Sequence, residues 1–171
     1  MADARAKARA LLIPGNRAST PSSSDKQLTR ADFLHMNPTK YHFNRVILIE
    51  EDDIDIFVTE KTLSTVNFAK HVEVMNADVA YIRLRNGKDL PDFIFLGLHS
   101  RFKSGFDFLD ELQFLPREVR TIKVVLLSVS PFVSDEEKAW KYEQVVGYFQ
   151  KPIKVDALQS LYGTQILTDH D

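Results

Sequence analysis

Short apolar runs alternate with longer amphipathic segments along this chain from residue 45 onward. The five runs lie at 45–49, 71–75, 92–96, 122–127 and 145–149. Runs of this length, rich in Val, Ile, Leu and Phe, are typical of strands buried on both faces of a parallel sheet. We therefore predict an α/β domain in which a doubly wound, five-stranded parallel sheet lies between two layers of helices.

The segments between the runs predict helices at about 54–67, at 77–85, from Gly105, from Ser134, and from 155 to about 167. Asn86-Gly87 predicts a left-handed cap that ends the second helix. Five βα units joined by short turns favour right-handed crossovers and the flavodoxin-like strand order 2-1-3-4-5. The inward-facing residues expected in the first helical segment are Ile54, Phe57, Val58, Lys61, Thr62 and Phe68, and those in the third are Phe106, Leu109, Leu112 and Phe114.

Residues 1–44 lack a sustained apolar period and contain the linker-like stretches Pro14-Gly15 and 19–25. We expect them to form a disordered or poorly structured extension that folding of the domain does not require. Its basic, serine-rich and acid-poor character is an alternative signature of an organelle transit peptide. The expected organisation is thus an extension at 1–44, one domain at 45–168 and a tail at 169–171.

Composition excludes several classes of protein. The 171 residues contain no cysteine, so disulfides and thiolate metal sites are excluded, and a reducing cytoplasm is the expected location. A formal net charge of −2 gives no electrostatic basis for binding nucleic acid or an anionic membrane. No run approaches the roughly 18 apolar residues that a membrane span requires.

Polar residues follow the apolar runs at the strand ends, where open parallel sheets bind ligands. Four acids, Glu50-Glu51-Asp52-Asp53, follow the first run, Ser128 ends the fourth, and Lys151-Pro152 follows the fifth. The third run ends on Gly97, which contributes no side chain. We expect carboxylates, a hydroxyl and a lysine to gather around Gly97.

This arrangement resembles the receiver domain of two-component response regulators over nearly all of residues 45–168. In that family an acidic pair holds Mg²⁺, an aspartate after the third strand accepts a phosphoryl group, and a Ser or Thr and a Lys-Pro complete the pocket. The resemblance places Glu50 and Glu51 at the acidic pair, Ser128 at the hydroxyl and Lys151 at the lysine. It places Tyr148 at the aromatic position that switches rotamer in many receivers.

The resemblance breaks at the phosphoacceptor position, which falls on Gly97. Family members often have Asp-(Ile/Leu)-x-Met-Pro there, whereas this chain has Gly97-Leu-His-Ser-Arg101, and the Met-Pro pair is missing. A glycine supplies no nucleophile. His99 lies two residues beyond, but the loop that follows a strand tip is expected to turn its imidazole away from the acidic pocket.

The resemblance also implies what the pocket holds. Glu51 is one methylene longer than the usual aspartate and Gly97 removes a further ligand, so we expect no cofactor and at most weak Mg²⁺ binding. The partner expected for Lys151 is Glu50 or Glu51. Ser128 has an alternative role in satisfying local backbone groups, and Tyr148 has one as a core aromatic. Trp140 is expected to pack against the domain. The family allows the Lys151-Pro152 bond to be cis or trans.

The leading hypothesis is a stand-alone receiver-fold signalling module of a two-component phosphorelay, not an enzyme, that lacks the acceptor aspartate and acts through protein–protein contact. Its expected partners are a sensor histidine kinase or another response regulator, with a homodimer as a further assembly. One alternative is an ordinary phosphorylatable single-domain response regulator in which Gly97 is an Asp-to-Gly substitution. A flavodoxin-type cofactor binder is disfavoured, because four carboxylates after the first strand would repel a phosphate.

Overall fold

The computed structural model describes residues 41–100, 103–130 and 132–163, so the expectations for 1–40 and for the tail at 169–171 lie outside the described residues. The compact unit that contains these residues begins at Tyr41. Its elements, in chain order, are β1 (Phe43–Ile49), α3 (Asp53–Thr65), β2 (Ala69–Met75), α4 (Ala77–Arg85), β3 (Phe93–Gly97), α5 (Gly105–Leu112), α6 (Arg117–Arg120), β4 (Lys123–Ser128), α7 (Val133–Ala139), β5 (Val145–Gln150) and α8 (Val155–Gly163).

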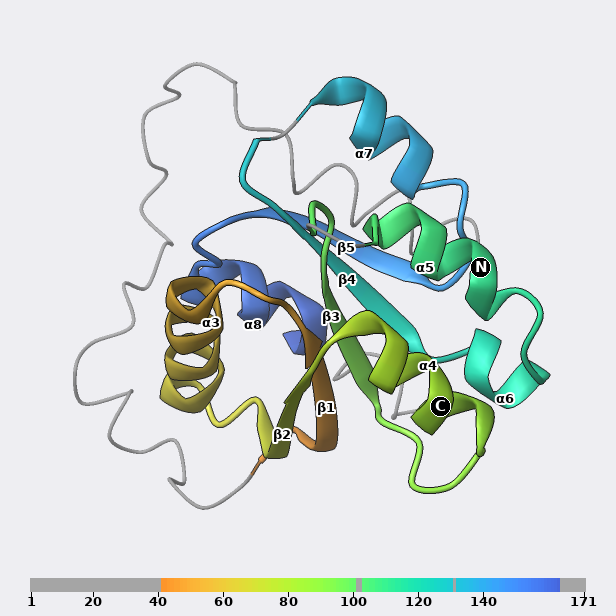
Figure 1. Ribbon diagram of the computed structural model, residues 1–171. Helices are drawn as coiled ribbons and strands as arrows, with labels where there is room; N and C mark the ends of the chain where they lie inside the picture. Colours follow the sequence, from red (N-terminus) through yellow and green to blue (C-terminus); the bar gives the residue numbers. More distant parts are fainter. Residues whose placement is uncertain (1–40, 101–102, 131, 164–171) are drawn as a thin grey trace, which may run out of the picture. The chain divides into compact units, whose positions relative to one another are not determined.

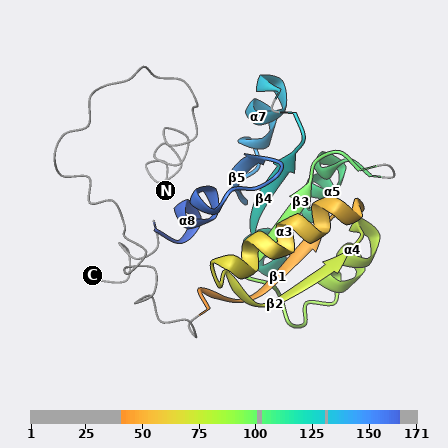
Figure 2. The same cartoon turned by 90° about the vertical axis from the view of Figure 1, so that its left-hand side faces the viewer.

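The five strands form one parallel sheet in the order β2-β1-β3-β4-β5, which confirms the predicted flavodoxin-like α/β fold. α3 and α8 cover one face of the sheet, and α4, α5, α6 and α7 cover the other (Figure 1). A view turned by 90° shows α3 lying across β1 and β2 (Figure 2). In this part of the chain, every helix is too short or too polar to span a bilayer.

Successive side chains of the central strands point to opposite faces of the sheet, so a hydrophobic core forms on each face. The register pairs Val46 with Phe93 and Ile47 with Ile94, so successive residues of β1 and β3 point to opposite helical layers. One core contains Ile47, Ile94 and the apolar sides of α4 and α5. On the other face, Phe68 packs edge-on against Phe93 and Phe95 at ring-centroid distances of 5.5 and 5.4 Å.

Side-chain caps fix where three helices begin, immediately after the strand ends. The Asp52 carboxylate accepts hydrogen bonds from the backbone N–H groups of Ile54 and Asp55, both at 3.0 Å, at the start of α3. Asn76 caps α4 in the same way, and Ser104 caps α5. Each such cap stabilises the start of its helix by about 1 kcal/mol.

The stripe predicted for the first helix is wrong at three of its six residues, although Phe68 is buried as expected. The buried residues of α3 are Thr59 and Leu63, whereas Ile54, Phe57 and Lys61 are exposed. Apolar residues occur on more than one side of this helix, so periodicity alone did not identify its inward face. Ile54 and Phe57 therefore lie on the solvent side of α3.

The other sequence predictions differ in smaller ways. Phe114 was expected to point inward, but α5 ends at Leu112, so Phe114 falls beyond the helix and is 86% exposed, while Leu115 is buried. β1 and β2 each begin two residues earlier than predicted, and the short α6 was not anticipated. Gly87, with a φ of 67°, confirms the left-handed cap after α4.

Candidate functional site

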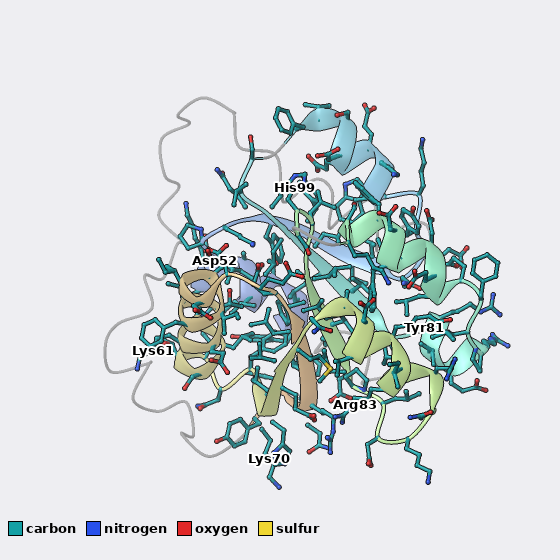
Figure 3. All side chains as sticks on the ribbon, in the orientation of Figure 1. Asp52, Lys61, Lys70, Tyr81, Arg83 and His99 are labelled. Carbon is teal, nitrogen blue, oxygen red and sulfur yellow. The ribbon has the colours of Figure 1, made fainter. Side chains whose placement is uncertain are left out.

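The carboxyl ends of the strands surround a cavity of about 760 Å³. Figure 3 labels Asp52 at the start of α3 and His99 beyond β3 at this end of the sheet, and Lys70 at the opposite end. The residues that line the cavity are Glu50, Glu51, Asp52, Asp53, Ile54, Asp55, Asn76, His99, Ser100, Val129 and Lys151. The sequence-predicted acids and the lysine therefore do meet at one site.

Glu50 is the buried acid of this group. It follows β1 directly, and its Oε1 accepts hydrogen bonds from the backbone N–H groups of Glu51 at 2.9 Å and Asp52 at 3.2 Å. These bonds fold the carboxylate back over the strand end, so that Oε2 is directed toward the centre of the pocket. A buried carboxylate needs such partners, because leaving it unpaired would be strongly unfavourable.

Lys151 supplies the counter-charge. Its Nζ donates to Oε2 of Glu50 and, at 2.9 Å, to Oδ2 of Asp55. The Lys151 and Glu50 side chains are only 8% and 5% exposed. Burial alone would lower the pKa of Lys151, but the hydrogen bonds that its ammonium group donates to Asp55 and Glu50 outweigh this effect, and the pKa is raised. The bond from Lys151 to Pro152 is cis.

The Glu50 partner of Lys151 was one of the two predicted from sequence, and Asp55 was missed. Asp55 lies in the first turn of α3, three residues after the Asp52 cap. A carboxylate in the first turn of a helix is expected because it interacts favourably with the helix dipole. Nothing in the sequence therefore marked Asp55 as a partner of Lys151. Glu51 lines the cavity beside this pair.

Gly97 is the last residue of β3 and pairs with Leu127 of β4. An ideal Cβ placed on Gly97 would lie only 2.6 Å from Oε2 of Glu50 and 3.4 Å from the carbonyl oxygen of Ile49. Any side chain at this position would therefore force the Glu50 carboxylate to move. The carboxylate of Glu50 occupies the space into which a residue 97 side chain would project.

Ser128 is the last residue of β4, and Tyr148 lies within the neighbouring strand β5. The Ser128 hydroxyl donates to the carbonyl oxygen of Ser130 at 2.8 Å and accepts from its N–H at 3.3 Å, so it satisfies local backbone. Tyr148 is buried among core residues. Burial raises the pKa of Tyr148, although the Ser128 hydroxyl acts in the opposite direction.

Two further residues occupy the loop after β3. His99 is half-exposed, and its Nε2 lies 3.8 Å from Oδ2 of Asp135 in α7. Lys103, which sequence reasoning did not single out, donates to Glu111 at 2.8 Å and to Asp78 at 2.9 Å. The hydrogen bond that Lys103 donates to Glu111 is the main cause of the raised pKa of Lys103. Lys103 thus links this loop to α4 and α5.

The positions of the acidic and histidine side chains determine whether the pocket can bind a metal ion. Within residues 41–100, 103–130 and 132–163, no group of three or more His, Asp or Glu side chains is placed to hold a metal ion. Two ion pairs at the centre of the pocket join one ammonium group, that of Lys151, to the carboxylates of Glu50 and Asp55. The site therefore contains a cation of its own.

No family model and no curated protein sequence matches this chain. Solved structures do. A response regulator receiver protein from Dyadobacter fermentans is 28% identical, with a TM-score of 0.63 over 71% of this chain and 97% of its own. A two-component response regulator from Cytophaga hutchinsonii is 23% identical, with a TM-score of 0.66 over 73% of this chain and 98% of its own. The phosphorylated cyanobacterial phytochrome response regulator RcpA is 25% identical, with a TM-score of 0.55 over 72% and 91%.

The fold is that of a response-regulator receiver domain. These likenesses cover nearly the whole length of the receiver structures and support a two-component signalling module. What this pocket can do depends on the side chains that this chain carries there.

Proposed function

We propose that this chain is a receiver-fold signalling module of a two-component phosphorelay that has no phosphoacceptor and acts through protein–protein contact. The observation that carries the proposal is the pairing of Gly97 with Glu50. Gly97 ends the strand whose last residue is the acceptor aspartate in receivers, and the Glu50 carboxylate fills the space beside it.

The chemistry of phosphoryl transfer supports this reading. The reaction needs a nucleophile in line with the phosphorus and positive charge near its equatorial oxygens. Gly97 offers no nucleophile, and the Lys151 ammonium is already bonded to Glu50 and Asp55. An incoming phosphoryl group would also meet the buried Glu50 carboxylate, and like charges repel.

We further propose that the residues present do not fit Mg²⁺. This ion requires near-octahedral oxygen ligands at about 2.0–2.1 Å. Both oxygens of Glu50 are engaged, one with backbone N–H groups and one with Lys151, and position 97 provides no ligand. A metal ion would have to displace an ammonium group that is already paired. We therefore derive no step of the function through a metal.

A sensor histidine kinase or another response regulator is the class of partner that the receiver fold suggests, with a homodimer as a further assembly. Exposed apolar side chains support a function in contact. The start of α7, the helix that follows β4, is surrounded in the sequence by three exposed apolar side chains, those of Val129, Phe132 and Val133. Solvated apolar residues concentrated in one segment are typical of interaction surfaces.

The proposal is tested with acetyl phosphate. After incubation with this donor and Mg²⁺, we expect intact-mass analysis to show no adduct of one phosphoryl group, because Gly97 presents no carboxylate. A receiver domain with an acceptor aspartate, treated in parallel, shows that the donor is competent. An adduct on this chain that hydroxylamine removes, as it removes acyl phosphates, would contradict the proposal.

An ordinary response regulator with an Asp-to-Gly substitution at position 97 is the second candidate, since the rest of the receiver pocket is present. An aspartate at position 97 would require the Glu50 carboxylate to shift, because its Cβ would lie 2.6 Å from Oε2. A flavodoxin-type cofactor binder has no support in the site. Glu50, Asp52 and Asp53 stand where a phosphate cradle would need backbone N–H groups and hydroxyls.

A further inference from the structure

A second cavity, of about 410 Å³, lies at the amino ends of the strands, at the opposite edge of the sheet from the acidic pocket. Its lining includes the first residues of β1, β3 and β4, which are Phe43, Phe93 and Lys123. Figure 1 shows this end of the sheet, with α6 beside the amino end of β4. Cavities of several hundred Å³ are typical of sites for small organic ligands. Because it shares no lining residue with the acidic pocket, this cavity is a separate candidate site.

Much of the lining is apolar. The rings of Phe43 and Phe93 pack edge-on, with their centroids 4.7 Å apart. The other apolar residues that line the cavity are Leu90, Pro91 and Ile122. Removing apolar surface from water is favourable, so this lining favours a ligand that has an apolar group of its own.

Two side chains of opposite charge also line the cavity, and within the described part of the chain neither of them forms an ion pair. Lys123 is half-buried, and its Nζ lies 5.4 Å from the centroid of the Phe93 ring. Burial lowers the pKa of Lys123, although attraction to Asp92 acts in the opposite direction. Glu118, from α6, is exposed beside the cavity. Each of the two can therefore gain a partner from a bound molecule.

The remaining charged residue of the lining, Asp92, is already engaged. Its Oδ2 accepts hydrogen bonds from the backbone N–H groups of Asn44 at 2.8 Å and Arg45 at 2.9 Å. These bonds join the loop before β3 to the start of β1. A ligand in the cavity consequently finds one ammonium group and one carboxylate without partners, those of Lys123 and Glu118.

We propose that this cavity binds an apolar amino acid in its free, zwitterionic form. The carboxylate of the ligand pairs with Lys123, its ammonium group pairs with Glu118, and its side chain lies against Phe43 and Pro91. The inference goes beyond the proposed function, because it assigns a small-molecule site at the other end of the sheet.

The charges favour this class of ligand over others. A simple anion would pair with Lys123 but would also meet the carboxylates of Asp92 and Glu118, and like charges repel. An amine without a carboxylate would pair with Glu118 but would approach the Lys123 ammonium. An uncharged apolar molecule would dehydrate both charged groups without replacing their water. An apolar amino acid supplies both charges and the apolar group from a single carbon atom.

The test is an NMR titration of the isotope-labelled full chain with L-leucine and L-phenylalanine. We expect saturable shifts of the backbone amide signals of Phe43, Phe93 and Lys123, with a dissociation constant on the order of 1 mM for ligands of this size. Two analogues each lack one charge: isocaproate has no ammonium group, and leucinamide has no carboxylate. At about pH 6.5, where the amine of leucinamide is protonated, each should bind about tenfold more weakly than leucine.

Two pairs of variants locate the charged partners. Lys123→Met removes the ammonium group but keeps an apolar stem, and it should weaken leucine binding about tenfold. Lys141→Met, at an exposed lysine outside the cavity, is its matched control and should bind as the unmodified chain does. Glu118→Gln should weaken binding several-fold, whereas Glu137→Gln, at an exposed position in α7, should not.

The absence of saturable shifts with both amino acids would overturn the proposal. Equal binding of leucine and isocaproate, or of leucine and leucinamide, would also overturn it, because one charge would then suffice. Shifts confined to the acidic pocket around Glu50 would place the ligand at the wrong end of the sheet. If Lys123→Met does not fold, the analogues decide the question on the unmodified chain. All of these outcomes are independent of acetyl phosphate labelling, so this inference and the proposed function can fail separately.

Discussion

Replacement of Lys151 by Met is expected to lower the free energy of unfolding by about 3–5 kcal/mol, the range observed when one partner of a buried ion pair is removed. Lys151 is the only cation bonded to Glu50 among the interactions found in the described residues, and both side chains are nearly fully buried. Without it, the Glu50 carboxylate remains in a low-dielectric site with only backbone N–H partners. Urea unfolding at neutral pH measures the change.

The control is the double variant Glu50→Gln/Lys151→Met. It removes both charges while the Gln side chain can still accept the backbone N–H groups of Glu51 and Asp52. We expect the double variant to be more stable than Lys151→Met alone, because no charge is left unpaired. A loss below about 1 kcal/mol for Lys151→Met would mean that the pair contributes no more than a surface salt bridge.

The second large effect is expected at position 97. In chelator, Gly97→Asp should lower the free energy of unfolding by about 1–3 kcal/mol, the range typical of overpacking. Its Cβ would lie 2.6 Å from Oε2 of Glu50, and its carboxylate would add a like charge to the pocket. The lower backbone entropy of Asp works in the opposite direction by about 0.5–1 kcal/mol. Mg²⁺ should restore much of the lost free energy of unfolding, because the variant brings a third carboxylate into the pocket and the ion offsets the repulsion among the three.

Gly97→Ala separates the two causes. It adds the Cβ without the charge, so its loss should be smaller than that of Gly97→Asp and should not respond to Mg²⁺. Thermal or urea unfolding of both variants with chelator and with Mg²⁺ gives the comparison. If Gly97→Asp is more stable than the unmodified chain in chelator, glycine at this position is a defect and not part of a pocket whose charged groups are paired with one another.

The fold was predictable because the short apolar runs and the helical segments between them indicate the same architecture. Short apolar runs such as 92–96 are typical of buried strands of a parallel sheet. Side-chain caps at Asp52, Asn76 and Ser104 begin the helices that follow β1, β2 and β3. The positions of Glu50 and Lys151 followed from topology, since parallel strands end at one edge of the sheet.

The details that sequence did not predict depend on geometry that no pattern contains. The inward face of α3 was misassigned because Ile54 and Phe57 have the spacing of a buried stripe while Thr59 and Leu63 are the buried pair. Asp55 was hidden among ordinary first-turn acids. The overlap of the Glu50 carboxylate with the side-chain space of Gly97 depends on a rotamer, which only coordinates provide.

The most direct test of the account measures the free energy of unfolding of the unmodified chain in chelator and in about 10 mM Mg²⁺ at matched ionic strength. Because both oxygens of Glu50 are already engaged and position 97 provides no ligand, we predict a difference below about 0.5 kcal/mol, whereas an ion bound with a dissociation constant of about 1 mM would add about 1.4 kcal/mol. Gly97→Asp, measured alongside, should show the larger response. An increase of 1.4 kcal/mol or more in the unmodified chain would contradict the account of a pocket held by Glu50, Asp55 and Lys151 without a metal ion.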